Sequence, residues 1–204
     1  KAKGTEIGEN ILLDLFSKNG FTIISPEQLT LDEQIAVVRN TKLLCGIIGT
    51  LGHNMLFAKP EQHMILVNKT HNINVAQMDI NKMKNLDMTY IDSYLAEFPS
   101  LIGNGPFLIT YSEMLNQYVE KHNWKKPAED VISETVLKRN LQEYEEMYRS
   151  RNLKNLRLVY EKNPDRFDYF APDHLLELEM RFYHLEHPAT MREKIFYQYN
   201  RVKR

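Results

Sequence analysis

The chain has 204 residues, a length that suits one sizeable α/β domain with an extension, or two small domains. Its composition, 43% hydrophobic and 26% charged, is that of a globular protein, and its net charge of −1 excludes a global field that recruits nucleic acid or an anionic membrane. A single cysteine, Cys45, excludes an intramolecular disulfide framework, and no apolar stretch approaches the ~20 residues that span a bilayer.

The first third of the chain alternates between helical and strand patterns. In chain order we predict a helix over 1–20, a strand over 21–24, a helix over 30–39, a strand over 43–48, a helix over 51–57 and a strand over 63–67. Asn19-Gly20 supplies the stop of the first helix, and Thr30 with Glu33 fits the capping box that opens the second. The strands are continuous apolar runs, as is typical when both faces of a sheet are covered. This alternation predicts right-handed βαβ units on a parallel sheet.

The pattern changes beyond this alternation. The next predictions are a polar loop or irregular helix and further strands within 68–110, namely a strand over 89–95 and, after a turn at 103–106, a strand over 107–109. Ser112 caps a predicted helix that runs to Lys121, and from Pro127 onward the pattern is helical. We therefore predict the α/β class, with a Rossmann-like parallel-sheet domain over 1–122 and an all-helical C-terminal extension over 127–204.

One segment, residues 45–58, points most directly to a binding site. An apolar strand opens into small residues at Gly49 and Thr50, after which come His53, Asn54 and an apolar helical turn. A strand, a glycine-containing loop and a helix in this order expose backbone N–H groups to an anionic ligand at a helix N-terminus. The residues match neither the dinucleotide nor the P-loop pattern. A buried strand with a tight turn, in which His53 caps or packs, is therefore an equal alternative.

Four stretches around this segment are informative through their order and spacing. They are 20–29 (GFTIISPEQL), 31–34 (LDEQ), 41–46 (TKLLCG) and 49–60 (GTLGHNMLFAKP). Together they resemble the glycosyltransferase family 61 domain, in which a strand and helix lead to a small-residue loop and an apolar turn. That family includes bacterial capsular-polysaccharide enzymes and eukaryotic glycan transferases. The resemblance covers about residues 7–68, weakens toward residue 110 and is absent from the helical remainder.

The resemblance implies a GT-B-type transferase with two Rossmann-like lobes and a nucleotide-diphosphate sugar donor in the cleft. This chain would supply the C-terminal, donor-binding lobe. Backbone N–H groups at Gly49 and Thr50 would hold the diphosphate, and His53, as the catalytic residue, would stabilise the leaving nucleotide. Gly52 and Asn54 belong to the same predicted substrate-binding set. Enzymes of this type commonly stabilise the departing diphosphate without a metal, and we expect neither a metal nor a cofactor.

Two departures from the family's pattern affect what the chain can do alone. Leu51-Gly52 intervenes where many members carry small residues directly in the loop. A two-lobed fold also needs an N-terminal lobe, whereas this chain begins at Lys1, near the connection between lobes. We therefore expect the general base and the site for a glycan or lipid-linked acceptor to lie in sequence that is missing here.

A second polar stretch follows the strand predicted over 63–67. His71, Asn72 and Asn74 come where the carboxyl ends of strands face the ligand crevice of an α/β sheet. They are predicted to contact base, ribose or sugar, with a solvated polar loop as the alternative. The remaining histidines show no ligand spacing, so we predict no metal site.

The C-terminal tail leaves two interpretations open. Phe196, Tyr197 and Tyr199 among basic residues fit peripheral contact with an anionic membrane or a lipid-linked acceptor, or a helix packed on the core. The lone thiol and the lack of a signal-peptide pattern predict a cytoplasmic protein, at the inner face of the membrane if the tail binds there. The predicted function is glycosyl transfer, or its donor-binding half, in surface-polysaccharide assembly. The alternative is a non-catalytic interaction module that binds a protein partner through its helical half.

Overall fold

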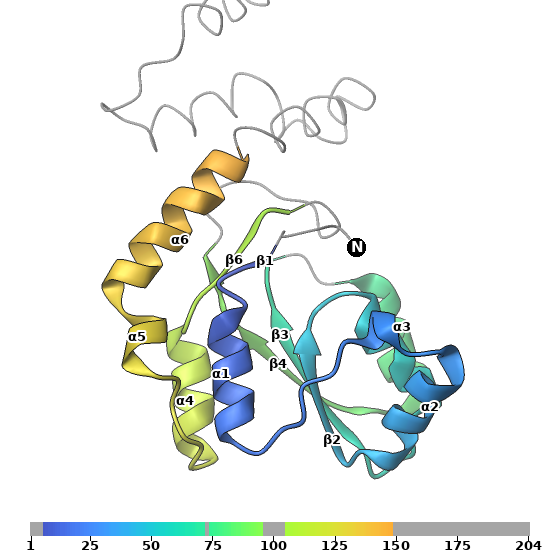
Figure 1. The fold of residues 1–204 in the computed structure, drawn as a ribbon. Helices are drawn as coiled ribbons and strands as arrows, with labels where there is room; N and C mark the ends of the chain where they lie inside the picture. The colour runs from blue at the N-terminus through green and yellow to red at the C-terminus, as the bar shows by residue number, and fades with distance from the viewer. Residues whose placement is uncertain (1–5, 72–73, 96–104, 149–204) are drawn as a thin grey trace, which may run out of the picture. The chain divides into compact units, whose positions relative to one another are not determined.

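The computed structural model describes residues 6–71, 74–95 and 105–148, which form a mixed α/β fold (Figure 1). The strands are β1 (Glu6–Ile7), β2 (Leu43–Ile47), β3 (His63–Asn68), β4 (Asp87–Asp92), β5 (Tyr94–Leu95) and β6 (Phe107–Ile109). The helices are α1 (Asn10–Lys18), α2 (Leu31–Asn40), α3 (Val75–Lys84), α4 (Glu113–Lys121), α5 (Glu129–Ile132) and α6 (Glu134–Met147). Two 3-10 segments are η1 (Pro26–Gln28) and η2 (Thr50–Phe57). The predicted α/β class is confirmed.

Two three-stranded sheets lie at the centre of the described residues. β2, β3 and β4 run parallel to one another with β3 in the middle. In the other sheet β6 lies between β1, which is parallel to it, and β5, which is antiparallel. Ser93, between β4 and β5, joins the two sheets. Its N–H donates to the carbonyl of Asn68 at 3.2 Å, and its carbonyl accepts from the N–H of Thr110 at 3.1 Å. The prediction of a parallel sheet holds for β2–β4 and is wrong for β5.

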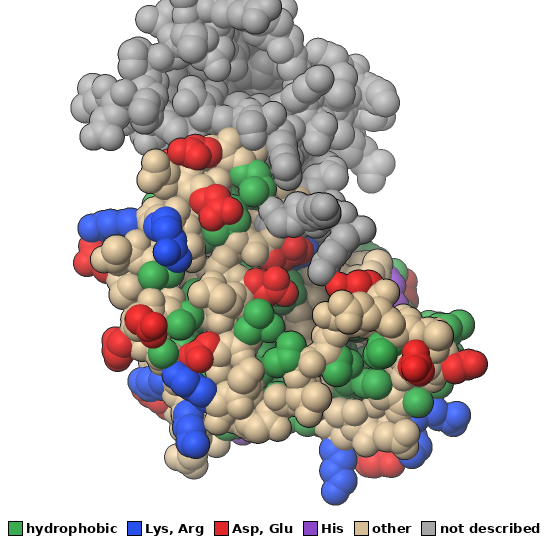
Figure 2. Space-filling model, viewed as in Figure 1, with side chains coloured by type: hydrophobic (Ala, Val, Ile, Leu, Met, Phe, Trp, Pro, Cys, Tyr) green, Lys and Arg blue, Asp and Glu red, His purple; other side chains and the backbone are tan. Residues whose placement is uncertain are grey.

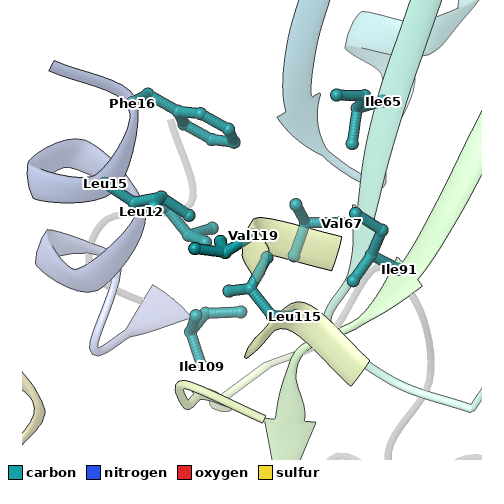
Figure 3. Packing of buried hydrophobic residues seen from close by; sticks show 9 residues of the cluster. All are labelled: Leu12, Leu15, Phe16, Ile65, Val67, Ile91, Ile109, Leu115 and Val119. Carbon is teal, nitrogen blue, oxygen red and sulfur yellow. The ribbon is translucent and has the colours of Figure 1, made fainter. Parts of the chain in front are cut away.

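Helices cover both faces of the parallel sheet, with α1 and α4 on one side and α2 and α3 on the other (Figure 1). Alternate residues of a strand point to opposite faces, so each strand contributes to two cores. Figure 3 shows the core beneath α1 and α4, which is formed by Leu12, Leu15, Phe16, Ile65, Val67, Ile91, Ile109, Leu115 and Val119. The core on the opposite face is formed by Val38, Met55, Ala58, Met64 and Leu66.

The segment 21–24, predicted as a buried strand, is an irregular connection, and that prediction is wrong. Phe21 is held by aromatic contacts, with its ring centroid 5.4 Å from that of Phe16 and 5.3 Å from that of Trp124. Ile23 and Ile24 are 47% and 42% exposed. An apolar run becomes a strand only where a neighbouring strand pairs with its backbone, and this run has no such neighbour among the described residues.

Three other element boundaries differ from the prediction. Of the helix predicted over 1–20, the described part from residue 6 contains β1 and then α1, because Gly8 turns the chain between them at φ +84°, a conformation that favours glycine. A Cβ at Gly8 would lie 2.3 Å from the carbonyl oxygen of Ile109, so the close approach to β6 also requires glycine. The helix predicted over 51–57 is the 3-10 segment η2, and the strand predicted over 89–95 is divided into β4 and β5 at Ser93.

The predictions for helices after β3 agree more closely with the structure. Within the stretch predicted as a polar loop or irregular helix, α3 is a regular helix whose first turn is capped by Asn74. Ser112 caps α4 as predicted, with its Oγ accepting from the N–H of Leu115 at 3.1 Å. The helical pattern from residue 127 is confirmed as far as α5 and α6, which pack against α1 and β6. The rest of that pattern, including Phe196, Tyr197 and Tyr199, lies outside the described residues, and the boundary between 1–122 and 127–204 stays a prediction.

The described surface carries both signs of charge. Figure 2 shows acidic and basic side chains scattered over one face, with hydrophobic side chains between them. None of the helices in the described part of the chain is both long and apolar enough to cross a membrane.

Candidate functional site

The candidate site lies at the carboxyl edge of the parallel sheet. Because β2 and β3 are parallel neighbours, the segment after β2 (residues 49–54) and the segment that begins at Lys69 leave from the same edge. The N–H of Ile48 donates to the carbonyl of Val67 at 2.8 Å, so the pairing extends to the residue before the loop. The two polar stretches singled out in the sequence are therefore neighbours, as the parallel register requires.

The N-terminus of η2 is presented at this edge. Among the described residues no side chain caps the first turn of η2, in contrast to the capped first turns of α2, α3 and α4. The first N–H groups of a helix have no intrahelical acceptor, so those of Thr50 and Leu51 suit an anion. Thr50 is exposed and adds a hydroxyl. Gly49, at φ 168°, has an extended backbone that any residue adopts, so its conformation does not require glycine.

The structure places His53 next to Asn74, although the two residues were predicted as site residues in separate stretches of the sequence. The Nε2 of His53 lies 3.1 Å from the Nδ2 of Asn74. The Oδ1 of Asn74 caps α3 by accepting from the N–H of Ala76 at 3.0 Å, which orients the amide and leaves its Nδ2 to donate to the imidazole. Since Nε2 then accepts, the imidazole carries its proton on Nδ1. The hydrogen of Nδ1 is the one that His53 has for a ligand.

Asn54 is engaged by a residue that the sequence did not single out. Its Nδ2 donates to the Oε1 of Gln34 at 3.1 Å. The Nε2 of Gln34 donates in turn to the carbonyls of Pro26, at 3.0 Å, and Leu29, at 3.2 Å. Asn54 thus fastens η2 to α2 and η1, and its predicted role toward phosphate or sugar stays a prediction. The only sequence signal for Gln34 was its place in the LDEQ stretch.

Gly52 is a packing glycine. It is buried, and a Cβ added to it would lie 2.3 Å from the Oε1 of Gln77 and 3.3 Å from the Cδ1 of Leu66. The absence of a side chain therefore lets η2 approach α3 and β3 closely. This contact explains why glycine stands here without a ligand, and the predicted substrate contact of Gly52 stays a prediction.

The residues that follow β3 lie in different environments. Lys69 is largely buried and forms an ion pair with Glu6, with 2.5 Å between Nζ and Oε1, while its Nζ lies 4.3 Å from the ring centroid of Phe107. His71 is exposed. Asn72 lies outside the described residues, so its predicted contact is not placed. Asn74 is therefore the member of the predicted set that the structure brings to the candidate site.

The ends of β3 and β4 carry polar groups that sequence reasoning missed. Asn68 is 6% exposed, and its Nδ2 donates to the Oδ1 of Asp92 on the neighbouring strand at 2.7 Å. The Oδ1 of Asn68 and the Oε1 of Gln77 are buried without a hydrogen-bond partner among the described residues. A polar residue directly at the end of a buried apolar strand was the available signal for Asn68.

Other reactive side chains lie apart from this edge. His63 sits at the amino end of β3, where its Nδ1 is 2.7 Å from the Oδ2 of Asp87 and its Nε2 is 3.0 Å from the Oγ1 of Thr89. Burial raises the pKa of the Cys45 thiol to about 12, which agrees with a packed side chain and not with a nucleophile. Within residues 6–71, 74–95 and 105–148, no three His, Cys, Asp or Glu side chains are grouped to hold a metal ion.

A comparison with protein families gives one match, which covers the first third of the chain. Residues 3–65 match the Glycosyltransferase 61 family. No curated protein and no solved structure matches the chain. The match supports family 61 and, broadly, a glycosyltransferase that acts on a sugar donor and a glycan acceptor.

The Glycosyltransferase 61 match covers only part of the candidate site. It contains β1, α1, α2, β2 and η2 and ends within β3. Thr50 and His53 therefore lie inside the matched stretch, whereas Asn68 and Asn74 lie beyond it. The contact between His53 and Asn74 is therefore known from the structure and not from the family match.

Proposed function

We propose that this chain binds the nucleotide-diphosphate sugar of a glycosyltransferase at the carboxyl edge of β2 and β3. The observation that carries the proposal is the pair formed by His53 and Asn74 beside the uncapped N-terminus of η2. The Glycosyltransferase 61 match runs through the same segment, which supports a sugar donor as the ligand. The proposed setting is the cytoplasmic assembly of a surface polysaccharide, in a GT-B-type arrangement with Rossmann-like lobes.

The proposed chemistry stabilises the leaving group. An acceptor hydroxyl oxygen attacks the anomeric carbon, the bond from that carbon to the diphosphate oxygen breaks, and the nucleoside diphosphate leaves with the electron pair. The N–H groups of Thr50 and Leu51 and the Nδ1 hydrogen of His53 are donors for the charge that develops on the diphosphate. Asn74 fixes the imidazole so that Nδ1 is the donor. The proton of the acceptor passes to a general base that we place in a separate acceptor lobe.

Titration of the whole chain with UDP, GDP and CMP, followed by calorimetry and ligand-observed NMR, tests the proposal. We expect saturable binding of at least one diphosphate and about tenfold weaker binding in His53→Ala, because one charge-assisted hydrogen bond is lost. His122→Ala is the matched control, since His122 is exposed at the end of α4, and its affinity should equal that of the native chain.

A second variant tests how His53 is held. Asn74→Asp keeps an oxygen to cap α3 but removes the amide donor and adds a negative charge beside the diphosphate, so we expect weaker binding in a folded chain. If no nucleotide binds to the native chain, the donor proposal fails and the interaction-module alternative remains.

A further inference from the structure

A cavity lies among residues that do not belong to the candidate site at the carboxyl edge of β2 and β3. It has a volume of about 110 Å³ and is lined by the start of α1, the residues after β6, and α5 and α6. Ile11, Val131 and Val136 form part of its apolar wall, and Thr110 and Asn140 contribute polar groups. An enclosed apolar cavity of ~150 Å³ accommodates benzene. This cavity is smaller but partly open to solvent, so a ring can enter it while part of the molecule stays outside.

Asn140 is the unusual member of the lining. Its side chain is 6% exposed, and no hydrogen-bond partner for its amide is found among residues 6–71, 74–95 and 105–148. The Nδ2 of Asn140 lies 3.4 Å from the position that a Cβ on Gly8 would take, so the amide is close to the turn before α1. An amide in a cavity wall that makes no hydrogen bond to the described part of the protein is a hydrogen-bonding point for an occupant.

The residues that line the cavity favour an uncharged occupant. None of its described residues is acidic or basic, and burial raises the pKa of Tyr111, which keeps that phenol neutral. A charged ligand would lose its hydration here without an opposite charge to compensate. A neutral molecule with an apolar body meets no such cost and gains from contact with the aliphatic wall.

We propose that this cavity binds a small neutral molecule with an apolar body and one amide or hydroxyl group, which pairs with Asn140. The site is formed by elements other than those that position His53, and apart from α1 its lining lies beyond the Glycosyltransferase 61 match. The proposal therefore stands or falls independently of donor binding.

The test uses the full chain with ¹³C-labelled isoleucine, leucine and valine methyl groups and three probes of similar size. Benzamide has the neutral apolar body and the amide, toluene lacks the polar group, and benzoate carries a charge. We expect benzamide to shift the methyl signals of Ile11, Val131 and Val136 in a saturable manner and to bind about tenfold more tightly than toluene or benzoate. The exposed methyl groups of Ile23 and Ile24 should not respond.

Two variants on the same helix decide the role of the amide. Asn140→Leu should lose the preference for benzamide over toluene, and Asn140→Ala gives the same information if leucine does not fit. Gln142→Leu is the matched control, because Gln142 is an exposed amide on α6, and it should keep the preference. Equal binding of benzamide and toluene by the native chain, or no shift of the lining methyls, overturns the proposal. So does a shift of those methyls with UDP alone, which would make the cavity part of a nucleotide site.

Discussion

Gly52 and Gln77 lie at the closest approach of η2 to α3. Gln77 is fully buried, and its Nε2 donates to the Oδ1 of Asn81 at 2.8 Å, so its amide has little freedom to move aside. The Oε1 of the same amide occupies the space where a side chain at residue 52 would stand. The position of η2, and with it the position of His53, therefore depends on one residue without a side chain.

We expect Gly52→Ala to lower the free energy of unfolding by about 1–3 kcal/mol, because the added methyl forces Gln77 or η2 to shift within a packed core. Urea unfolding followed by circular dichroism measures this. Gly49→Ala is the matched control, since the nearest atom to its added Cβ is 4.0 Å away, and it should change stability by less than about 0.5 kcal/mol. Equal losses in the two variants would contradict the packing role of Gly52.

At the scale of elements, α2 owes its start to a reciprocal cap. The Oγ1 of Thr30 accepts from the N–H of Glu33 at 3.3 Å, and the Oε2 of Glu33 accepts from the N–H of Thr30 at 2.8 Å. Through Gln34 the same helix holds Asn54 of η2. The cap therefore stabilises not only α2 but also the platform on which the candidate site rests.

Thr30→Ala should lower the free energy of unfolding by about 1 kcal/mol, since the N-terminal N–H groups of α2 lose their side-chain acceptor. Thr30→Ser keeps the hydroxyl and should retain most of the native stability. Both are measured by urea unfolding. A Thr30→Ser variant as unstable as Thr30→Ala would show that the methyl group, and not the cap, matters.

At the scale of the whole described structure, α1 is tied to the chain between α4 and α5. The Nδ2 of Asn19 donates to the carbonyl of Lys125 at 2.9 Å, and the Oδ1 of Asn19 accepts from the N–H of Lys125 at 2.8 Å. The Oδ2 of Asp14 accepts from the N–H of Ala128 at 2.7 Å. These bonds join residues more than a hundred positions apart and fix where the chain turns toward α5.

The pKa of Asp14 lies below its usual value, first because of the Ala128 N–H and then because of Lys18. A carboxyl whose pKa is lower in the folded chain contributes stability above its unfolded pKa, and this contribution is lost as the pH falls through the folded pKa. We therefore expect the stability difference between the native chain and Asp14→Asn to shrink as the pH falls from about 6 to about 2. Carboxyl ¹³C titration measures the pKa directly.

Lys18→Ala separates the two causes. Because the Ala128 N–H is the larger of them, the pKa of Asp14 should stay below its usual value in this variant. A return to the usual value would mean that the ion pair with Lys18 dominates and that the connection to Ala128 is weak.

The sequence predicted the features that depend on nearby residues, namely helix caps and apolar strands. The caps at Thr30 and Ser112 lie within four residues of their partners, and the apolar runs of β2 and β3 needed only their own composition. It could not place the contacts that join distant segments. Three features depend on where other elements lie, which no local pattern records. They are the contact of His53 with Asn74, the hydrogen bond from Asn54 to Gln34, and the break between β4 and β5 at Ser93.

The pairing of β1 with β6 bears on how the family-like stretch can fold. β1 begins that stretch, yet its partner at Phe107 and Leu108 lies about a hundred residues later, so the pairing closes a long loop. The matched stretch ends within β3, one edge of which pairs with β4. Cut out alone, residues 3–65 would leave two strand edges unpaired and prone to associate with other chains. The segment that matches the family is thus not a folding unit, and its fold is completed by residues beyond the match.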